Sequence, residues 1–103
     1  MPDPMKIRAN LLGDSTEVKV LMSHEMETGQ RKDAQGKVIP AWFIQTVEVT
    51  CAGKPVLSAQ WGPAVSKNPF LSFKFKGGAK GDKVVVTWVD NRGEKRSDEA
   101  TIA

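Results

Sequence analysis

Reactive side chains are scarce in this sequence, which has one cysteine, one histidine and no tyrosine among its 103 residues. The single Cys51 cannot form a disulfide within the chain, and one thiol with one imidazole is too small a set for a structural zinc site of the usual Cys/His kind. The lack of tyrosine removes phenolic acid–base chemistry. No nucleophile elbow, P-loop, paired catalytic carboxylates or Cys-x-x-Cys motif is present. These absences leave little room for most catalytic machinery, and we expect no cofactor or metal.

Long hydrophobic runs are also missing, since no apolar stretch approaches the roughly 18 residues of a membrane span. The chain opens on Met1-Pro2-Asp3-Pro4 rather than on a basic stretch followed by an apolar one, so no signal peptide is predicted. Taken alone, these features indicate a cytosolic protein or one that a partner carries elsewhere.

The composition that remains is that of a folded domain, with 40% hydrophobic and 26% charged residues. A chain of this length can bury a core without disulfides or metal, and we expect one domain over residues 1–103.

Apolar and polar residues alternate with a period of two along most of the chain, and no stretch shows helical spacing. Gly- and Asn-containing turns separate the alternating segments. The sequence therefore predicts an all-β, immunoglobulin-like β-sandwich of about seven antiparallel strands, without the disulfide and tyrosine corner of antibody domains. The segment 83–90 has valines on both faces, at Val85 and Val89 as well as Val84 and Val86, and is expected to be central and covered on both sides. The predicted strands are 6–12, 16–22, 42–51, 55–61, 70–76, 83–90 and 95–102.

Two connections, residues 23–40 and 62–69, are longer than the others. An irregular connection of more than about 12 residues in a small domain is more often functional than idle. We expect functional contacts on these two loops.

Cys51 follows Val47 and Val49 on one strand face, which predicts a buried thiol that acts as a small hydrophobe. His24 and Met26 are two positions apart, so they could point the same way and suit copper. Two ligands are too few for a closed site, and a metal or redox site using His24, Met26 and Cys51 stays as the alternative hypothesis.

The formal charge of +3 is concentrated in one segment, where four lysines and one acid lie between residues 74 and 83. In a nucleic-acid binder such lysines would lie beside aromatic platforms, but Phe73 and Phe75 alternate with them and face the other way. We prefer the interpretation that Lys74, Lys76, Lys80 and Lys83 protect a sheet edge from pairing with another chain.

Long motifs on both loops and their flanking strands resemble the SoxZ family, the small subunit of the SoxYZ carrier of thiosulfate oxidation. They are residues 21–33 (LMSHEMETGQRKD), 39–44 (IPAWFI) and 58–70 (SAQWGPAVSKNPF). The resemblance extends from Ile7 through the strand 86–90. The family's usual proline after the loop histidine is Glu25 here.

The resemblance implies an immunoglobulin-like, non-catalytic subunit that forms a heterodimer with SoxY, possibly within a higher assembly. In the family, SoxY carries sulfur intermediates on a cysteine of its Gly-rich C-terminal arm while other Sox proteins act on them transiently. This chain ends on residues 100–103 (ATIA) without such an arm, so Cys51 does not inherit the carrier role. The family works in the periplasm, which implies that this chain is exported bound to SoxY. This expectation replaces the cytosolic location that the sequence alone indicated. No nucleic acid or membrane is implied as a partner.

Contacts with SoxY, its arm or incoming enzymes are expected on the two loops, and the sequence leaves open which sandwich face meets SoxY. Arg31 and Lys32 would attract an anionic cargo or acidic groups. Trp42, Trp61 and Trp88 suit the core, but Trp61 at the mouth of the second loop could be an interface anchor. The predicted contact residues are His24, Met26, Arg31, Lys32, Trp61 and Asn68.

Overall fold

The computed structural model describes residues 4–103, and every regular element in that range is a β-strand. Each strand begins and ends within two residues of its predicted position, which confirms the all-β prediction. Residues 4–103 contain no helix that is long and apolar enough to cross a membrane. The strands are β1 (Lys6–Leu12), β2 (Ser15–Leu21), β3 (Ile44–Cys51), β4 (Lys54–Gln60), β5 (Phe70–Lys76), β6 (Lys83–Asp90) and β7 (Lys95–Thr101).

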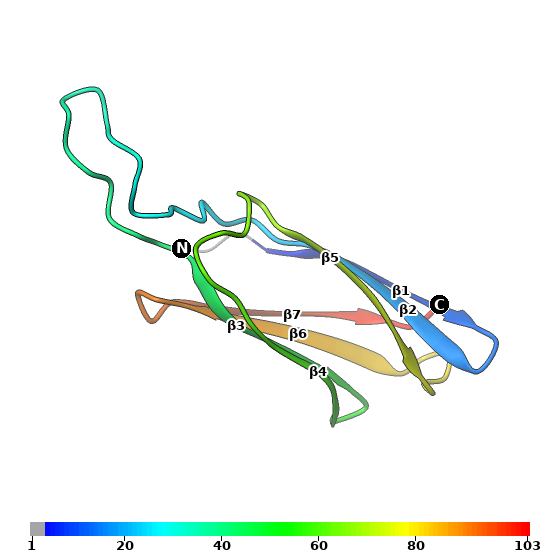
Figure 1. The fold of residues 1–103 in the computed structure, drawn as a ribbon. Helices are drawn as coiled ribbons and strands as arrows, with labels where there is room; N and C mark the ends of the chain where they lie inside the picture. Colours follow the sequence, from blue (N-terminus) through cyan, green and yellow to red (C-terminus); the bar gives the residue numbers. More distant parts are fainter. Residues whose placement is uncertain (1–3) are drawn as a thin grey trace.

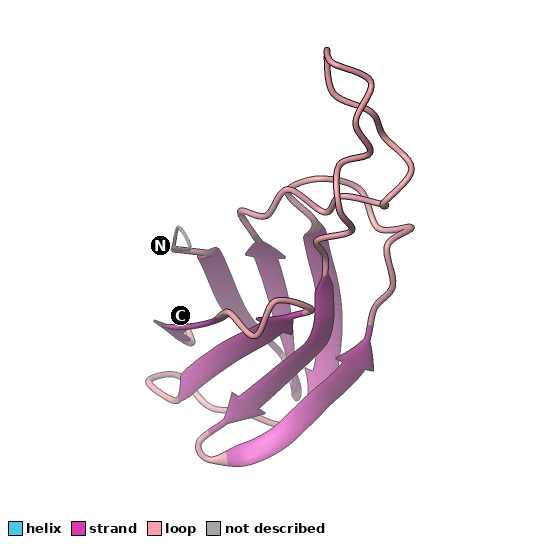
Figure 2. Cartoon of the chain, turned by 90° about the vertical axis from the view of Figure 1, so that its left-hand side faces the viewer, coloured by secondary structure: helices cyan, strands magenta, loops and turns pink. Residues whose placement is uncertain are grey.

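The strands form two antiparallel sheets that face each other, as Figure 1 shows. One sheet has the order β1-β2-β5 and the other the order β4-β3-β6-β7. Figure 2 shows the strands obliquely, with the long connection projecting beyond their ends. The predicted immunoglobulin-like sandwich is confirmed, and it differs from a closed barrel in leaving strand edges at its sides.

The core lies between the sheets because the period-two pattern turns valines of facing strands inward. Val18 and Val20 of β2 and Val47 and Val49 of β3 have no solvent exposure. Each fully buried valine contributes about 1.5–3 kcal/mol of hydrophobic free energy relative to an exposed one. Val84 and Val86 of β6 are buried in the same way, so the three strands form the centre of the core.

The prediction that both faces of β6 are covered is wrong for the outer face. β6 is central in its sheet, between β3 and β7, but Val85 and Val89 are only half-buried. They point to the outer face of the four-stranded sheet, and no element within residues 4–103 packs over that face.

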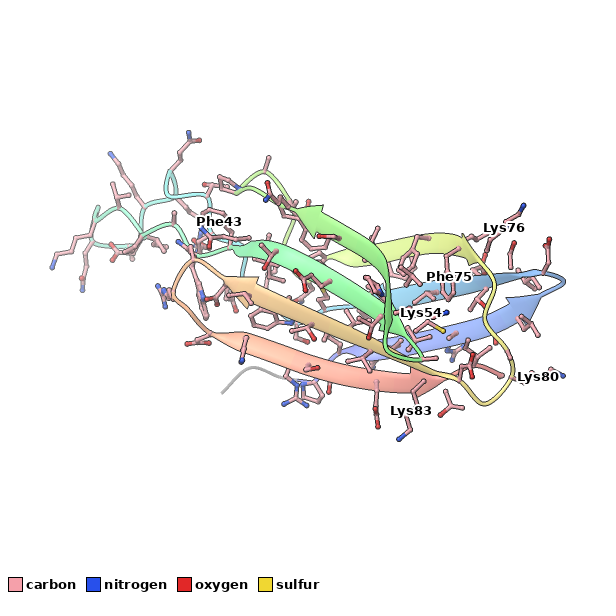
Figure 3. The ribbon with its side chains drawn as sticks, turned by 90° about the horizontal axis from the view of Figure 1, so that it is seen from below. Phe43, Lys54, Phe75, Lys76, Lys80 and Lys83 are labelled. Carbon is pink, nitrogen blue, oxygen red and sulfur yellow. The ribbon has the colours of Figure 1, made fainter. Side chains whose placement is uncertain are left out.

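Hydrogen bonds close one side of the sandwich and leave β5 as an edge strand on the other. The N–H of Ala103 donates to the carbonyl of Ala9 at 3.0 Å, and that of Leu11 donates to the carbonyl of Ala103 at 3.1 Å. β5 pairs only with β2, so Lys74 and Lys76 lie on an edge strand as predicted. The prediction is wrong for Lys83, which begins β6, the strand between β3 and β7. At the end of β5, Lys76 extends away from the sandwich in Figure 3.

The connections divide between two ends of the molecule, and Figure 3 shows Phe43 at one end and Lys54, Lys80 and Lys83 at the other. We call the first the loop end, since it contains the connections 22–43, 61–69 and 91–94. The second is the turn end, formed by the short connections between β1 and β2, β3 and β4, and β5 and β6.

The long connection at the loop end is more ordered than the sequence suggests. Glu27 and Trp42 exchange backbone hydrogen bonds of 2.6 and 3.0 Å, and Lys32 forms an antiparallel bridge with Val38. The segment is therefore a narrow two-stranded ribbon, which projects from the end of the sandwich in Figures 1 and 2.

Candidate functional site

His24 is the second residue of the first long loop, and its side chain turns into the molecule, where it is only 1% exposed. Its Nδ1 accepts a hydrogen bond from the N–H of Met26 at 3.0 Å, so the ring proton of the neutral imidazole belongs on Nε2. That nitrogen lies 3.1 Å from Oδ2 of Asp90 and donates to it. Both ring nitrogens are thus used inside the chain, which leaves neither for a metal or a substrate.

Asp90, the last residue of β6, connects His24 to the rest of the loop end. Its Oδ2 also accepts the indole N–H of Trp42 at 2.7 Å, and its Oδ1 accepts the N–H groups of Arg92 and Glu94 at 3.0 and 2.9 Å. Burial raises the pKa of this carboxyl, but the hydrogen bonds from Trp42, His24 and the two backbone groups outweigh burial and hold its pKa below the ordinary value. The structure therefore holds a buried, ionised carboxylate with four donors around it.

Aromatic rings enclose this network. The ring centroids of His24 and Trp42 are 5.0 Å apart, and Trp88 meets His24 edge to face at 5.2 Å. The guanidinium of Arg92 lies 4.2 Å from the Trp42 ring centroid, on the solvent side. Such packing shields the His24–Asp90 pair from water and strengthens it.

The two long loops are joined at His24 and Asn68. The N–H of His24 donates to Oδ1 of Asn68 at 3.1 Å, and the N–H of Asn68 donates to the carbonyl of His24 at 2.9 Å. Asn68 has a φ of 51°, a left-handed conformation that asparagine tolerates better than most residues. Met26 is 4% exposed, and its Sδ accepts the N–H of Ile44 at 3.3 Å. These contacts fix the first loop against both the second loop and β3.

Arg31 and Lys32 lie on the exposed ribbon. Arg31 forms a bidentate ion pair with Glu27. The Nη2 atom of Arg31 lies 2.9 Å, and its Nε atom 3.1 Å, from carboxylate oxygens of Glu27. The hydrogen bond and charge of Glu27 raise the pKa of Arg31. Glu27 thus offsets the positive charge of Arg31 locally, while Lys32 presents its charge to solvent.

Trp61 is half-buried at the mouth of the second loop and packs against the core. It borders an open hollow of about 400 Å³. A second hollow of about 360 Å³ is bordered by both members of the Lys67–Glu25 ion pair, in which Nζ and the carboxylate oxygen are 3.3 Å apart. Trp61, Val65, Ser66, Lys67, Asn68, Pro69 and Phe70 line the first hollow, and Glu25, Met26, Glu27, Thr28, Arg31 and Lys67 line the second.

The structure thus brings five of the six predicted contact residues around the joined loops, whereas Lys32 lies farther out on the ribbon and lines neither hollow. His24 and Met26 hold the loops from within, and a contact of either side chain with a partner stays untested. The sequence reasoning missed Asp90, although an aspartate at a strand end before Asn91-Arg92-Gly93 is typical of a side chain that accepts turn N–H groups.

Cys51 lies at the turn end, far from His24. It is 6% exposed, which confirms the predicted burial, and burial with a smaller effect of Asp82 raises the pKa of its thiol. Met26 contacts Ile44 at the other end of the same strand, and seven residues of strand span about 23 Å. The geometry therefore does not gather His24, Met26 and Cys51, and no group of three or more His, Cys, Asp or Glu side chains within residues 4–103 is arranged to hold a metal.

The fold and this site define an immunoglobulin-like sandwich domain with an internally hydrogen-bonded loop end. The family described as sulphur oxidation protein SoxZ matches residues 5–101, nearly the whole chain. The chain therefore belongs to the SoxZ family and is a subunit of the Sox sulfur-oxidation system. This match confirms the family resemblance found in the sequence. No curated protein matches it.

Solved structures resemble the chain in fold. A superoxide reductase in the oxidised state has 18% identity and a TM-score of 0.63, over 99% of this chain and 89% of that one. The hypothetical protein PH1083 from Pyrococcus horikoshii OT3 has 19% identity and a TM-score of 0.64, over 99% and 89%. A superoxide reductase (neelaredoxin) from Ignicoccus hospitalis has 14% identity and a TM-score of 0.60, over 99% and 82%. At these identities the likeness shows the sandwich fold alone.

Proposed function

We propose that this chain is the non-catalytic subunit of the SoxYZ sulfur carrier, which binds SoxY and helps to present its cysteine arm to other Sox enzymes. The observation that carries the proposal is the burial of the chain's only thiol and only imidazole. A buried thiol with a raised pKa is a poor nucleophile, and the imidazole already has two hydrogen-bond partners. The sulfur chemistry then belongs to SoxY, and this chain supplies a surface.

The loop end is the surface that we assign to these contacts. Internal hydrogen bonds hold its loops in place, so a partner would find a preorganised surface and little ordering entropy would be lost on binding. Trp61 and Asn68 at one hollow and Arg31 at the other would meet SoxY, its arm or an enzyme, with Lys32 reaching farther out. We place this function in the periplasm, with export in complex with SoxY, and we assign no nucleic acid or membrane to the chain.

Co-expression with SoxY tests the pairing. We expect one complex in size-exclusion chromatography under native conditions, at a mass of one heterodimer or a multiple of it. Two separately eluting monomers would refute the proposal.

The Trp61→Ala variant tests the anchor, because removing a buried interface tryptophan weakens association by roughly tenfold or more. Trp61→Phe is the control, since it keeps an apolar ring, and we expect it to pair nearly as well as the parent chain. Urea unfolding of each free chain separates binding from folding. If Trp61→Ala pairs normally while the free chain loses several kcal/mol of stability, Trp61 belongs to the core and its assigned contact is wrong.

The Cys51→Ala variant tests whether the sulfur chemistry belongs to SoxY and needs no thiol from this chain. We expect a complex with this variant to load sulfur on SoxY as the parent complex does, as mass spectrometry of each subunit would show. A sulfur adduct on native Cys51, or a loss of loading in the variant, would contradict the non-catalytic role.

A further inference from the structure

Positive charge gathers on the outer face of the three-stranded sheet. The register aligns Lys6 with Leu21 and Phe70 in one row, and Arg8 with Lys19 in the next. This face has five cationic side chains and one carboxylate, an excess of four positive charges, whereas the whole chain has a formal charge of +3. The rest of the molecule thus has one net negative charge. The charged residues are Lys6, Arg8, Lys19, Lys74, Lys76 and Glu17.

These charges are poorly neutralised by the chain itself. Within residues 4–103, the only ion pair on this face joins Nζ of Lys19 to a carboxylate oxygen of Glu17 at 3.7 Å. Arg8 and Lys19 lie directly opposite each other on β1 and β2, and like charges in such a cross-strand pair destabilise a sheet. An external anion on this face would relieve that repulsion.

Two exposed apolar side chains lie beside the cations. Phe70 is 62% and Leu21 is 41% exposed, and they are paired across β5 and β2. Together with Lys6, Arg8 and Lys19 they border an open hollow of about 480 Å³. An apolar hollow surrounded by cations suits a group that is itself apolar and flanked by negative charge.

The outer face of the four-stranded sheet differs in charge. Its register places two carboxylates, Glu48 and Glu99, and two lysines, Lys83 and Lys95, on that face, so its charges balance. Nζ of Lys83 is 3.6 Å from a carboxylate oxygen of Glu99. The positive excess is therefore a property of one face and does not follow from the overall composition.

We propose that the outer face of β1, β2 and β5 is a docking surface for an acidic segment of a partner protein. One apolar side chain of that segment enters the hollow at Leu21 and Phe70, and its carboxylates meet Arg8 and Lys19. A single-stranded nucleic acid fits less well, because such binders stack bases on several aromatic side chains and Phe70 is the one aromatic residue on this face. The proposal is independent of where SoxY binds.

A titration of the full-length chain with a synthetic peptide, Glu-Asp-Glu-Phe-Asp-Glu-Asp, tests it by amide chemical-shift changes at about 0.01 M salt, where screening is weak. We expect saturable shifts confined to β1, β2 and β5, and an affinity that falls about tenfold at about 0.1 M salt. The uncharged peptide Gln-Asn-Gln-Phe-Asn-Gln-Asn and an oligothymidylate of matched charge are the comparison ligands, and both should bind more weakly.

Charge reversal on each face provides matched variants. Arg8→Glu should weaken binding of the acidic peptide about tenfold, and Lys95→Glu, with the same change in net charge on the other face, by less than about twofold. Phe70→Ser should weaken binding without changing its salt dependence, because it removes apolar contact only. The proposal is wrong if the peptide shifts no amide of this face, if Lys95→Glu weakens binding as much as Arg8→Glu, or if the oligothymidylate binds more tightly than the peptide.

Discussion

The loop end and the turn end of the sandwich are held together by different means. At the loop end, Asp90, Asn68 and His24 accept hydrogen bonds from loop N–H groups, and Asp90 joins connections that are far apart in the sequence. At the turn end, glycines with positive φ form the short turns between strands, and exposed lysines lie beside these turns (Figure 3). The order of the loop end therefore depends mainly on polar side chains that join distant connections. The turn end depends mainly on backbone conformation, although Thr16 Oγ1 donates to the carbonyl of Gly77 at 2.8 Å and Asp82 accepts the N–H of Ala79 at 3.1 Å.

The largest expected effect comes from removing the carboxylate at the centre of the loop end. Asp90→Ala leaves His24 Nε2, Trp42 Nε1 and two backbone N–H groups without their acceptor, and we expect the free energy of unfolding to fall by about 3–5 kcal/mol. Urea unfolding measures it. Asp14→Ala, at an exposed position of the turn end, is the control and should cost less than about 0.5 kcal/mol. Similar losses in the two variants would show that the ends do not differ as described.

A smaller effect is expected at Gly78, a turn-end glycine whose surroundings leave no room for a side chain. Gly78 has a φ of 85°, and a Cβ there would collide with Oγ1 of the buried Thr16. We expect the collision to lower stability by about 1–3 kcal/mol beyond the backbone cost of an alanine at positive φ, so Gly78→Ala should lose about 2–4 kcal/mol in total. Gly13→Ala is the control, with a φ of 65° and open space around the new methyl, and should cost about 1 kcal/mol from the backbone alone. Equal unfolding free energies for the two variants would exclude the steric effect.

The smallest expected effect is a pH dependence of the free energy of unfolding, which arises at the loop end from Asp90. The folded-state pKa of Asp90 lies below the ordinary value of 3.8, so its ionised form stabilises the fold above the unfolded pKa, and this contribution is lost as the pH falls through the folded pKa. The stability difference between the parent chain and Asp90→Asn should thus be largest near neutral pH and shrink in acid. Unfolding curves from neutral pH down into the acid range measure this difference. A difference that stays constant or grows in acid would contradict the lowered pKa.

The sequence predicted the strands well, because a sheet with one buried face leaves a period-two pattern that needs no knowledge of neighbours. It also placed Cys51 inward, from Val47 and Val49 on the same strand. It did not predict that β6 would be open on its outer side, since the pattern shows that a residue is apolar and not what covers it. The order of the connection 22–43 was missed too, because the alternation of apolar and polar residues does not show which residues its bridges join.

The candidate site was predicted only in part. His24 and Asn68 were singled out by their position on long loops, but their roles depend on each other and on Asp90, which is 66 residues from His24 along the chain. No local signal connects such residues, because their contact exists only after β6 has paired with β3.

The positions of the strands, the apolar side of each strand and the scarcity of reactive groups all follow from local alternation and composition, and the amino-acid sequence was enough to predict them. The tertiary structure alone decided that the imidazole of His24 is enclosed by Asp90 and Trp42. It also decided that cations of β1, β2 and β5 share one face with Phe70. Both arrangements consist of contacts between residues distant in sequence. Strand pairing and register set such contacts, and the pairing of these strands can be read only from the folded chain.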